Sequence, residues 1–235
     1  MEFDGPLTFT GNGTKTVLGQ LTLNGLTSLD QGVLVGGVIN GSTSLNVTGN
    51  STVRGVTFDT DVQVANFTSL TLENGLTLNS DLTLGTSSWS QLRWLGTQTL
   101  DGTGKVTVSN ASSSLTPASG TLTIESGIEI EGYGQVVGPW INRGTIRNTT
   151  ANTLTLSGNG WVNEGLIDVS VPGGSLALFG SGWSNAATGT MLLNDTTASL
   201  SGTYTQAGTL TANNAVINLG GSFTLANLGV LNLTS

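Results

Sequence analysis

Residues 153–167 read Thr-Leu-Thr-Leu-Ser-Gly-Asn-Gly-Trp-Val-Asn-Glu-Gly-Leu-Ile, and a similar phrase begins again at Ser175. The aromatic position of this phrase recurs at nearly constant spacing. The series consists of Trp140, Trp161, Trp183, Tyr204 and Phe223. Self-similarity with a period of about 21 residues is typical of a solenoid, in which each repeat buries its apolar face only against its neighbours. The pattern therefore predicts an elongated scaffold.

The remainder of the chain contains short runs in which apolar and polar residues alternate, such as Leu21-Thr-Leu23, Leu70-Thr-Leu72 and Leu82-Thr-Leu84. Alternation with period two, bounded by Asn-Gly and Gly-Gly turns, predicts many short strands and little or no helix. In the N-terminal half the spacing of these runs is uneven. Unequal turns favour an all-β, right-handed, single-stranded parallel β-helix of about 10–11 rungs, on the order of 50 Å long. We expect one continuous domain over residues 1–235.

The composition limits the partners that this chain can bind. Only 9% of the residues are charged, and 14 acidic against 6 basic residues give a net charge of −8. Because nucleic acids and anionic lipids require basic patches, neither is expected as a partner. There is no cysteine for disulfides and no apolar run long enough to cross a bilayer, so we expect no membrane insertion by this segment. The start at Met1-Glu-Phe-Asp4 and the end in mid-repeat at Ser235 predict a fragment of a longer repeat protein.

Aligning the repeats places equivalent residues in columns, and the first column is aromatic. It contains Trp140, Trp161, Trp183 and Tyr204, with Phe223 at the next repeat. Rings stacked from rung to rung would bury a large area and gain about 0.5–1.5 kcal/mol per pair beyond that burial. We interpret the column as an internal stack. The alternative is an exposed platform on which sugar rings bind.

The second column carries side-chain amides two positions after each aromatic residue. Its members are Asn142, Asn163, Asn185 and Gln206. Amides stacked along a solenoid can hydrogen-bond to one another and can satisfy the backbone groups of turns. We therefore predict a structural ladder, with a polar ligand-binding row as the alternative.

The third column is charged, and the sign alternates between rungs. Arg143 aligns with Glu164, and Arg147 aligns with Asp168, in each case one repeat later. Opposite charges on adjacent strands stabilise the register by a few tenths of a kcal/mol when they are exposed. These four residues are therefore predicted to be structural.

The residue inventory argues against an enzyme. The chain has no histidine and no cysteine, so common general bases and nucleophiles are missing. Glu129 and Glu131 share one face of a predicted strand, which is more typical of a solvated surface than of a catalytic pair. We expect no catalytic residue, no metal site and no cofactor.

The phrase Trp161-Val-Asn-Glu-Gly-Leu-Ile167, combined with the Leu-Thr-Leu strand before it, resembles the repeats of a known family type. It is similar to secreted bacterial β-helix adhesins of the filamentous-haemagglutinin and autotransporter-passenger kind, well over about residues 120–235 and in style before that. The resemblance implies a non-enzymatic stalk or adhesive shaft of a large secreted or cell-surface protein, with glycans or other cell-surface molecules as partners. The alternative is a β-helix module that binds or cleaves polysaccharide.

The ends and the irregularities of the repeat lead to two further expectations. Open rung ends present unpaired strand edges, which predicts end-to-end self-association. Because the repeated columns serve stability, a binding site is expected where the repeat breaks. The breaks lie around residues 85–100 and at the two-residue insertion Ala186-Ala187.

Overall fold

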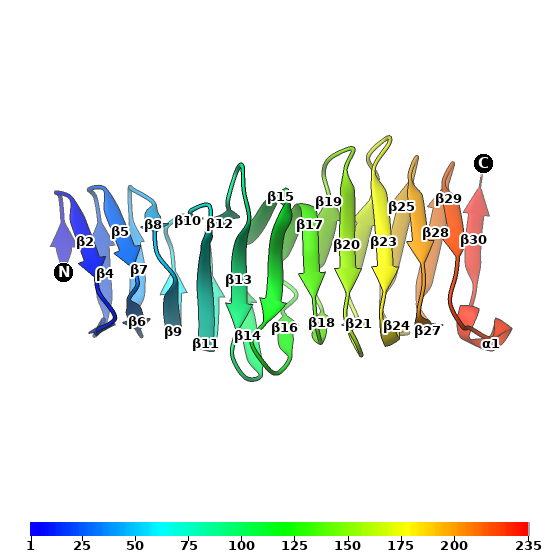
Figure 1. The fold of residues 1–235 in the computed structure, drawn as a ribbon, viewed down its shortest axis with the longest axis horizontal. Helices are drawn as coiled ribbons and strands as arrows, with labels where there is room; N and C mark the ends of the chain where they lie inside the picture. Colours follow the sequence, from blue (N-terminus) through cyan, green and yellow to red (C-terminus); the bar gives the residue numbers. More distant parts are fainter. Residues whose placement is uncertain (235) are drawn as a thin grey trace.

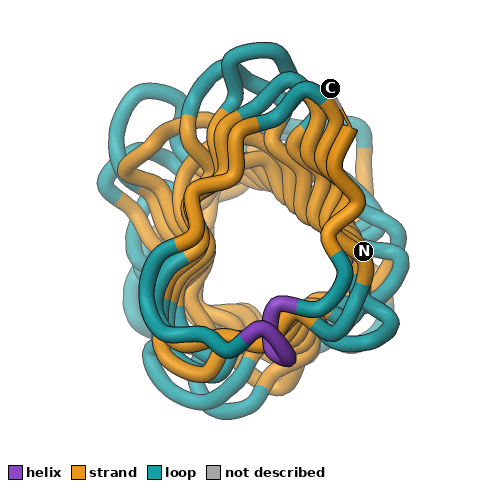
Figure 2. Tube along the Cα trace, turned by 90° about the vertical axis from the view of Figure 1, so that its right-hand side faces the viewer, coloured by secondary structure: helices purple, strands orange, loops and turns teal. Residues whose placement is uncertain are grey.

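Alternating apolar and polar residues form short strands that coil around one axis. The computed structural model describes residues 1–234 as a parallel β-solenoid of about 11 turns with almost no helix (Figure 1). Viewed from the C-terminal end, the last turn runs down the left side, across the bottom and up the right side as it approaches the viewer (Figure 2). This is the sense of a right-handed coil, so the predicted fold class is confirmed.

Each turn contributes strands to three faces of the rod, and every pairing between turns is parallel. Face 1 contains β1 (Glu2–Phe3), β4 (Gln20–Leu23), β7 (Val38–Gly41), β14 (Gln98–Gly102), β16 (Leu122–Ile124), β18 (Trp140–Asn142), β21 (Val162–Asn163), β24 (Ser181–Asn185) and β27 (Thr203–Gln206). Face 2 contains β2 (Leu7–Thr10), β5 (Thr27–Asp30), β8 (Leu45–Val47), β10 (Val62–Val64), β12 (Asp81–Leu84), β19 (Thr145–Asn148), β22 (Leu166–Val169), β25 (Thr190–Asn194), β28 (Thr209–Asn213) and β30 (Leu231–Thr234). Face 3 contains β3 (Thr14–Thr16), β6 (Val33–Val35), β13 (Ser90–Trp94), β20 (Thr153–Ser157), β23 (Ser175–Phe179), β26 (Thr197–Leu200) and β29 (Val216–Leu219).

Four longer strands bend around a corner of the rod and belong to two faces. Strands β9 (Ser51–Phe58) and β11 (Thr68–Leu78) continue from face 3 into face 1. Strands β15 (Lys105–Pro117) and β17 (Glu129–Val137) continue from face 2 into face 3. A single helical turn, α1 (Leu225–Leu228), crosses the C-terminal end of the rod. No helix among residues 1–234 is long and apolar enough to span a membrane.

The uneven spacing of the N-terminal runs has a simple geometric origin. Leu21–Leu23 lies on face 1, Leu70–Leu72 on face 3 and Leu82–Leu84 on face 2. Because these runs lie on different sides of the coil, the distance between them along the chain is not one full turn. Turn length also varies along a single face, because β12 reaches its partner β15 after a longer stretch of chain than β8 needs to reach β10. The N-terminal half therefore has the same architecture as the C-terminal half. The runs at Leu21–Leu23, Leu70–Leu72 and Leu82–Leu84 are therefore not equivalent positions of successive rungs.

Inward-pointing residues of equivalent turns form continuous apolar columns. On face 2, one such column is fully buried from Leu45 through Ile167. Its members are Leu45, Val62, Leu82, Val106, Ile130, Ile146 and Ile167. Complete burial of one such side chain contributes about 1.5–3 kcal/mol, but only when the turns above and below cover it. Stability is therefore shared between neighbouring turns.

A column of glycines allows the chain to turn the corner from face 3 to face 1. Gly180 has a φ of +132°, and a Cβ atom there would lie 1.7 Å from the carbonyl oxygen of Gly158. A Cβ atom on Gly202, one turn later, would lie 1.8 Å from the carbonyl oxygen of Gly180. Only glycine fits this approach of one backbone to the next, which explains the glycines that stand two or three residues before Trp161, Trp183 and Tyr204.

Candidate functional site

The aromatic column lies inside the rod on face 1. Trp140, Trp161 and Trp183 are fully buried, and Tyr204 is 3% exposed. The ring centroids of Trp140 and Trp161 are 4.6 Å apart, those of Trp161 and Trp183 are 4.6 Å apart, and those of Trp183 and Tyr204 are 4.5 Å apart. Phe223 continues the stack at 5.6 Å. Neighbouring rings and the core cover both faces of each inner ring, so a sugar ring cannot stack on these residues. The alternative interpretation of the column as an exposed sugar-binding platform is therefore wrong.

The polar atoms of these rings are satisfied unevenly. The indole N–H of Trp183 donates to the carbonyl oxygen of Ser201 at 2.9 Å, and that of Trp161 donates to Phe179 at 3.4 Å. The hydroxyl of Tyr204 is buried without a hydrogen-bond partner among the described residues. Burial raises the pKa of this phenol above its usual value, because the interior disfavours the phenolate.

The amide column forms a hydrogen-bonded ladder over three turns. The side-chain amide of Asn142 donates to Oδ1 of Asn163 at 2.8 Å, and that of Asn163 donates to Oδ1 of Asn185 at 2.8 Å. All three side chains are fully buried. The same amides also donate to backbone carbonyls, among them Gly165 in a turn and Thr209 at the start of β28. Turn satisfaction and side-chain stacking therefore occur together.

Gln206 occupies the next position of this column but does not extend the ladder. It pairs in register with Asn185, yet its amide donates to the carbonyl oxygen of Gly208 and its Oε1 is buried without a partner among the described residues. The extra methylene of glutamine changes where the amide lies, so the side-chain bond from Asn185 is not made. At the opposite end, Ile124 precedes Asn142, and Oδ1 of Asn142 therefore also lacks a donor within residues 1–234.

The predicted charge pairs are present, and each arginine has a second acid on the preceding turn. Nε of Arg143 lies 3.0 Å from Glu164, and its Nη1 lies 3.2 Å from Glu125. The hydrogen bond with Glu164 and the charge of Glu125 raise the pKa of the Arg143 guanidinium.

The second arginine repeats this arrangement on face 2. Nε of Arg147 lies 3.1 Å from Asp168, and its Nη1 lies 3.3 Å from Glu129. Both arginines therefore link three consecutive turns. Because these side chains are partly exposed, each pair contributes little on its own.

The two carboxylates that the sequence suggested as a possible catalytic pair are bound to separate cations. Glu129 pairs with Arg147, and Glu131 lies 2.9 Å from Nζ of Lys105. The hydrogen bond to Glu131 raises the pKa of Lys105. No cluster of three or more acidic residues within residues 1–234 is arranged to hold a metal ion. The arrangement is that of a surface charge network across turns.

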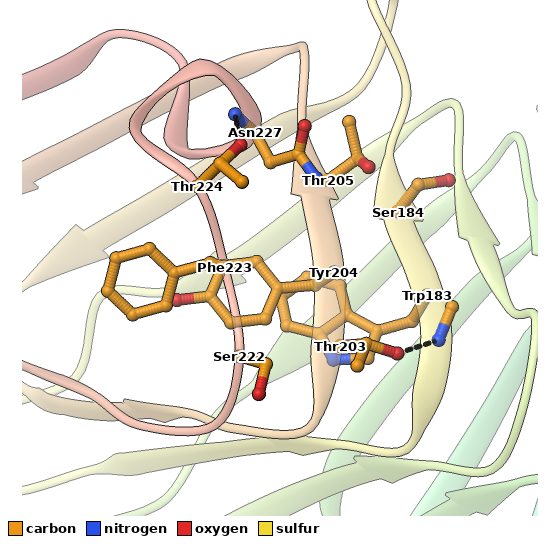
Figure 3. A pocket seen from close by; sticks show the side chains of 10 residues that line it. Trp183, Ser184, Thr203, Tyr204, Thr205, Ser222, Phe223, Thr224 and Asn227 are labelled. Atoms are coloured by element: carbon orange, nitrogen blue, oxygen red, sulfur yellow. Dashed lines mark hydrogen bonds between the residues drawn. The ribbon is translucent and has the colours of Figure 1, made fainter.

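A shallow cavity of about 450 Å³ lies at the C-terminal end of the aromatic stack (Figure 3). Trp183, Tyr204 and Phe223 lie side by side along one wall, and Thr224 and Asn227 approach from the last turn. Asn227 N–H donates to Thr224 Oγ1 and so caps the short helix α1. The cavity is bounded by the final turn of the coil.

The two predicted breaks of the repeat differ in what they expose. At Ala186-Ala187 the chain forms a tight turn, closed by the N–H of Gly189 donating to the carbonyl oxygen of Ala186 at 2.8 Å. Near residues 85–100, the turn before β13 brings Trp89 against the exposed Phe67, with ring centroids 6.1 Å apart and planes at 84°. The sequence pointed to this segment but not to Phe67, because the uneven spacing of the N-terminal runs does not show that Phe67 and Trp89 lie on adjacent turns.

Comparison of the chain with protein-family models, curated proteins and solved structures gives no match. The geometry of the rod and the chemistry of its surface are therefore the basis for any functional argument.

The amide ladder predicts that Asn163→Asp destabilises the rod in a pH-dependent manner. Nδ2 of Asn163 donates to Asn185, Gly165 and Thr190, so a carboxylate there would face three acceptors. At pH 7 we expect a loss of about 3–5 kcal/mol, since a buried charge would have no partner. Burial raises the pKa of the new carboxyl, so the folded state holds its proton more tightly and part of the loss is recovered near pH 4.

Urea unfolding followed by circular dichroism at both pH values measures this effect. Asn12→Asp, on an exposed turn, is the matched control and should follow the wild type. An equal loss at pH 7 and pH 4 would contradict the prediction, because it would show that the charge of the new carboxylate does not determine the effect.

Burial of Tyr204 predicts a loss of stability at alkaline pH. An unfolded tyrosine ionises near pH 10, whereas the buried phenol keeps its proton to higher pH. The unfolded state therefore loses protons first, and the free energy of unfolding decreases as pH rises above about 10. Tyr204→Phe removes this contribution and an unpaired hydroxyl, so its stability should decrease less between pH 8 and pH 11. Tyr133→Phe, which retains Tyr204, is the control; identical pH profiles for all three proteins would contradict the prediction.

Proposed function

We propose that this chain is a non-enzymatic, rigid segment of a large secreted or cell-surface bacterial protein, acting as a stalk that presents other parts and makes weak multivalent contacts. The observation that carries the proposal is the continuity of the buried columns. Ring stacking, amide bonds and ion pairs each connect one turn to the next along the axis. A rod held in this way resists bending, which is the property a stalk requires.

The surface also supports a spacer more than a cleaving enzyme. The acids Glu129 and Glu131 are each paired with a cation of a neighbouring turn. Their separate pairing leaves these two carboxylates unavailable as a free pair across a sugar-sized gap, which glycoside hydrolysis requires. The repeat motif of residues 161–167, similar to that of secreted β-helix adhesins, supports an extracellular or cell-surface location.

Rigidity can be measured directly, because the chain has no native cysteine to interfere with labelling. Thr8 and Asn232 are exposed and belong to the same outward column at opposite ends of face 2. Spin labels on Thr8→Cys and Asn232→Cys should give one narrow distance distribution near 50 Å, from about 4.8 Å per turn. A Thr8→Cys, Thr107→Cys pair, which spans roughly half of the rod, should give about 24 Å.

A broad distribution for the long pair would contradict a rigid stalk. The location is tested independently with antibodies against the purified rod. They should label intact cells of the organism that encodes the chain, and labelling only after lysis would overturn the extracellular part of the proposal.

A further inference from the structure

Phe67 combines an exposed aromatic ring with a backbone conformation that phenylalanine disfavours. Its side chain is 66% exposed and its φ is +62°. The other non-glycine residues with positive φ in the described part of the chain are polar: Gln31, Asn74, Asp195 and Asn214. A bulky residue with a left-handed backbone is strained. Because the ring of Phe67 is exposed, burial of its apolar surface does not offset this strain. Stability therefore does not explain why phenylalanine occupies this position.

Trp89 on the next turn holds the ring of Phe67 in a defined place. The two rings meet edge to face at 6.1 Å, and the N–H of Phe67 donates to the carbonyl oxygen of Trp89 at 2.7 Å. Oδ1 of Asn66 accepts hydrogen bonds from the N–H groups of Ser87 and Ser88. These bonds tie the two turns together, so the aromatic pair is ordered before any ligand arrives.

The coil is irregular at this corner between face 2 and face 3. On three successive turns, the connection between the aligned residues of face 2 and those of face 3 becomes longer. It spans residues 48–50 on the first turn, 65–69 on the second and 85–91 on the third. The connection is short again at 133–135, and it lengthens once more after Asn148. The aromatic pair thus lies on the widening part of the corner, where the chain departs from its repeat.

The turns that carry the pair and its neighbours contain no charged residue, and the carboxylate of Asp30 lies against Gly49 at the edge of this region. The turns at 48–50, 65–67, 85–89 and 109–113 consist of Gly, Ala, Asn, Ser and Thr together with the two aromatic residues. Aromatic surface suits the apolar C–H face of a sugar ring, while amides and hydroxyls suit its hydroxyl groups. An acidic or basic ligand would find no opposite charge in these four turns. The combination favours a neutral carbohydrate.

We propose that Phe67, Trp89 and the neighbouring Asn66 form a binding site for a neutral glycan on the side of the rod. The site would supply one of the weak contacts of an adhesive stalk, and in that sense the inference rests on the proposed function. It replaces the buried column of Trp140, Trp161, Trp183 and Tyr204 as the place where aromatic rings can meet a sugar.

Native electrophoresis through gels containing a neutral polysaccharide tests the proposal. The probes are β-glucan, galactomannan and xylan, with polygalacturonate as the charged comparison. We expect at least one neutral polysaccharide to retard the full chain. Phe67→Asn and Trp89→Ala should each weaken the apparent affinity by roughly tenfold or more. Phe179→Ala is the matched control, because Phe179 is also exposed, at 44%, but lies on face 3 away from this corner.

The melting temperature separates binding from folding. Asn tolerates the left-handed conformation, as Asn74 and Asn214 do in this chain, so Phe67→Asn should melt at the wild-type temperature or above it while losing retardation. The proposal is overturned if no neutral polysaccharide retards the wild type, if only polygalacturonate does, or if Phe179→Ala loses retardation equally. These failures would leave the label distances of the rod unchanged, so they are distinguishable from failure of the stalk proposal.

Discussion

Equivalent side chains on successive turns of a parallel coil lie about 4.8 Å apart, and every contact along this rod must fit that spacing. Flat rings satisfy it by stacking, as Trp140, Trp161 and Trp183 do at centroid distances of 4.6 Å. Side-chain amides satisfy it because each is both a donor and an acceptor, so a column of asparagines can bond along its whole length. Charged groups satisfy it only when the sign alternates, as around Arg143 and Arg147.

The same spacing explains why the columns begin and end where they do. The amide ladder requires asparagine on both sides, so it begins after Ile124 and its last side-chain bond reaches Asn185, one turn before Gln206. Glycines replace larger residues where one backbone approaches the next, as at Gly180 and Gly202. The buried interior thus depends on contacts between turns, which leaves the corners of the coil as the places that can vary.

The fold could be predicted from the sequence because the C-terminal columns recur at nearly constant spacing. Trp140, Trp161 and Trp183 with their asparagine partners mark successive turns without any ambiguity of face. The N-terminal runs do not, because Leu21–Leu23, Leu70–Leu72 and Leu82–Leu84 have the same composition on three different faces. Composition alone indicates the strand but not the side of the coil on which it lies.

The candidate site was only partly predictable for a related reason. The break around residues 85–100 is visible in the sequence, whereas the exposed ring of Phe67, its left-handed backbone and its contact with Trp89 one turn away are visible only in the structure. The burial of the tryptophan column likewise depends on which way its strand faces. The repeat period of the sequence shows which residues align on successive turns. It does not show whether their side chains point into the core or into solvent, which only the three-dimensional structure shows.

Native-state hydrogen exchange tests most directly whether the columns of face 1 hold the rod together. Protection reports the free energy of the opening that exposes each amide. We predict the slowest exchange in β18, β21 and β24, where ring stack and amide ladder coincide, with protection falling toward both ends of the rod. Uniform protection along the axis, or slowest exchange in turns that lack these columns, would contradict this view of the rod.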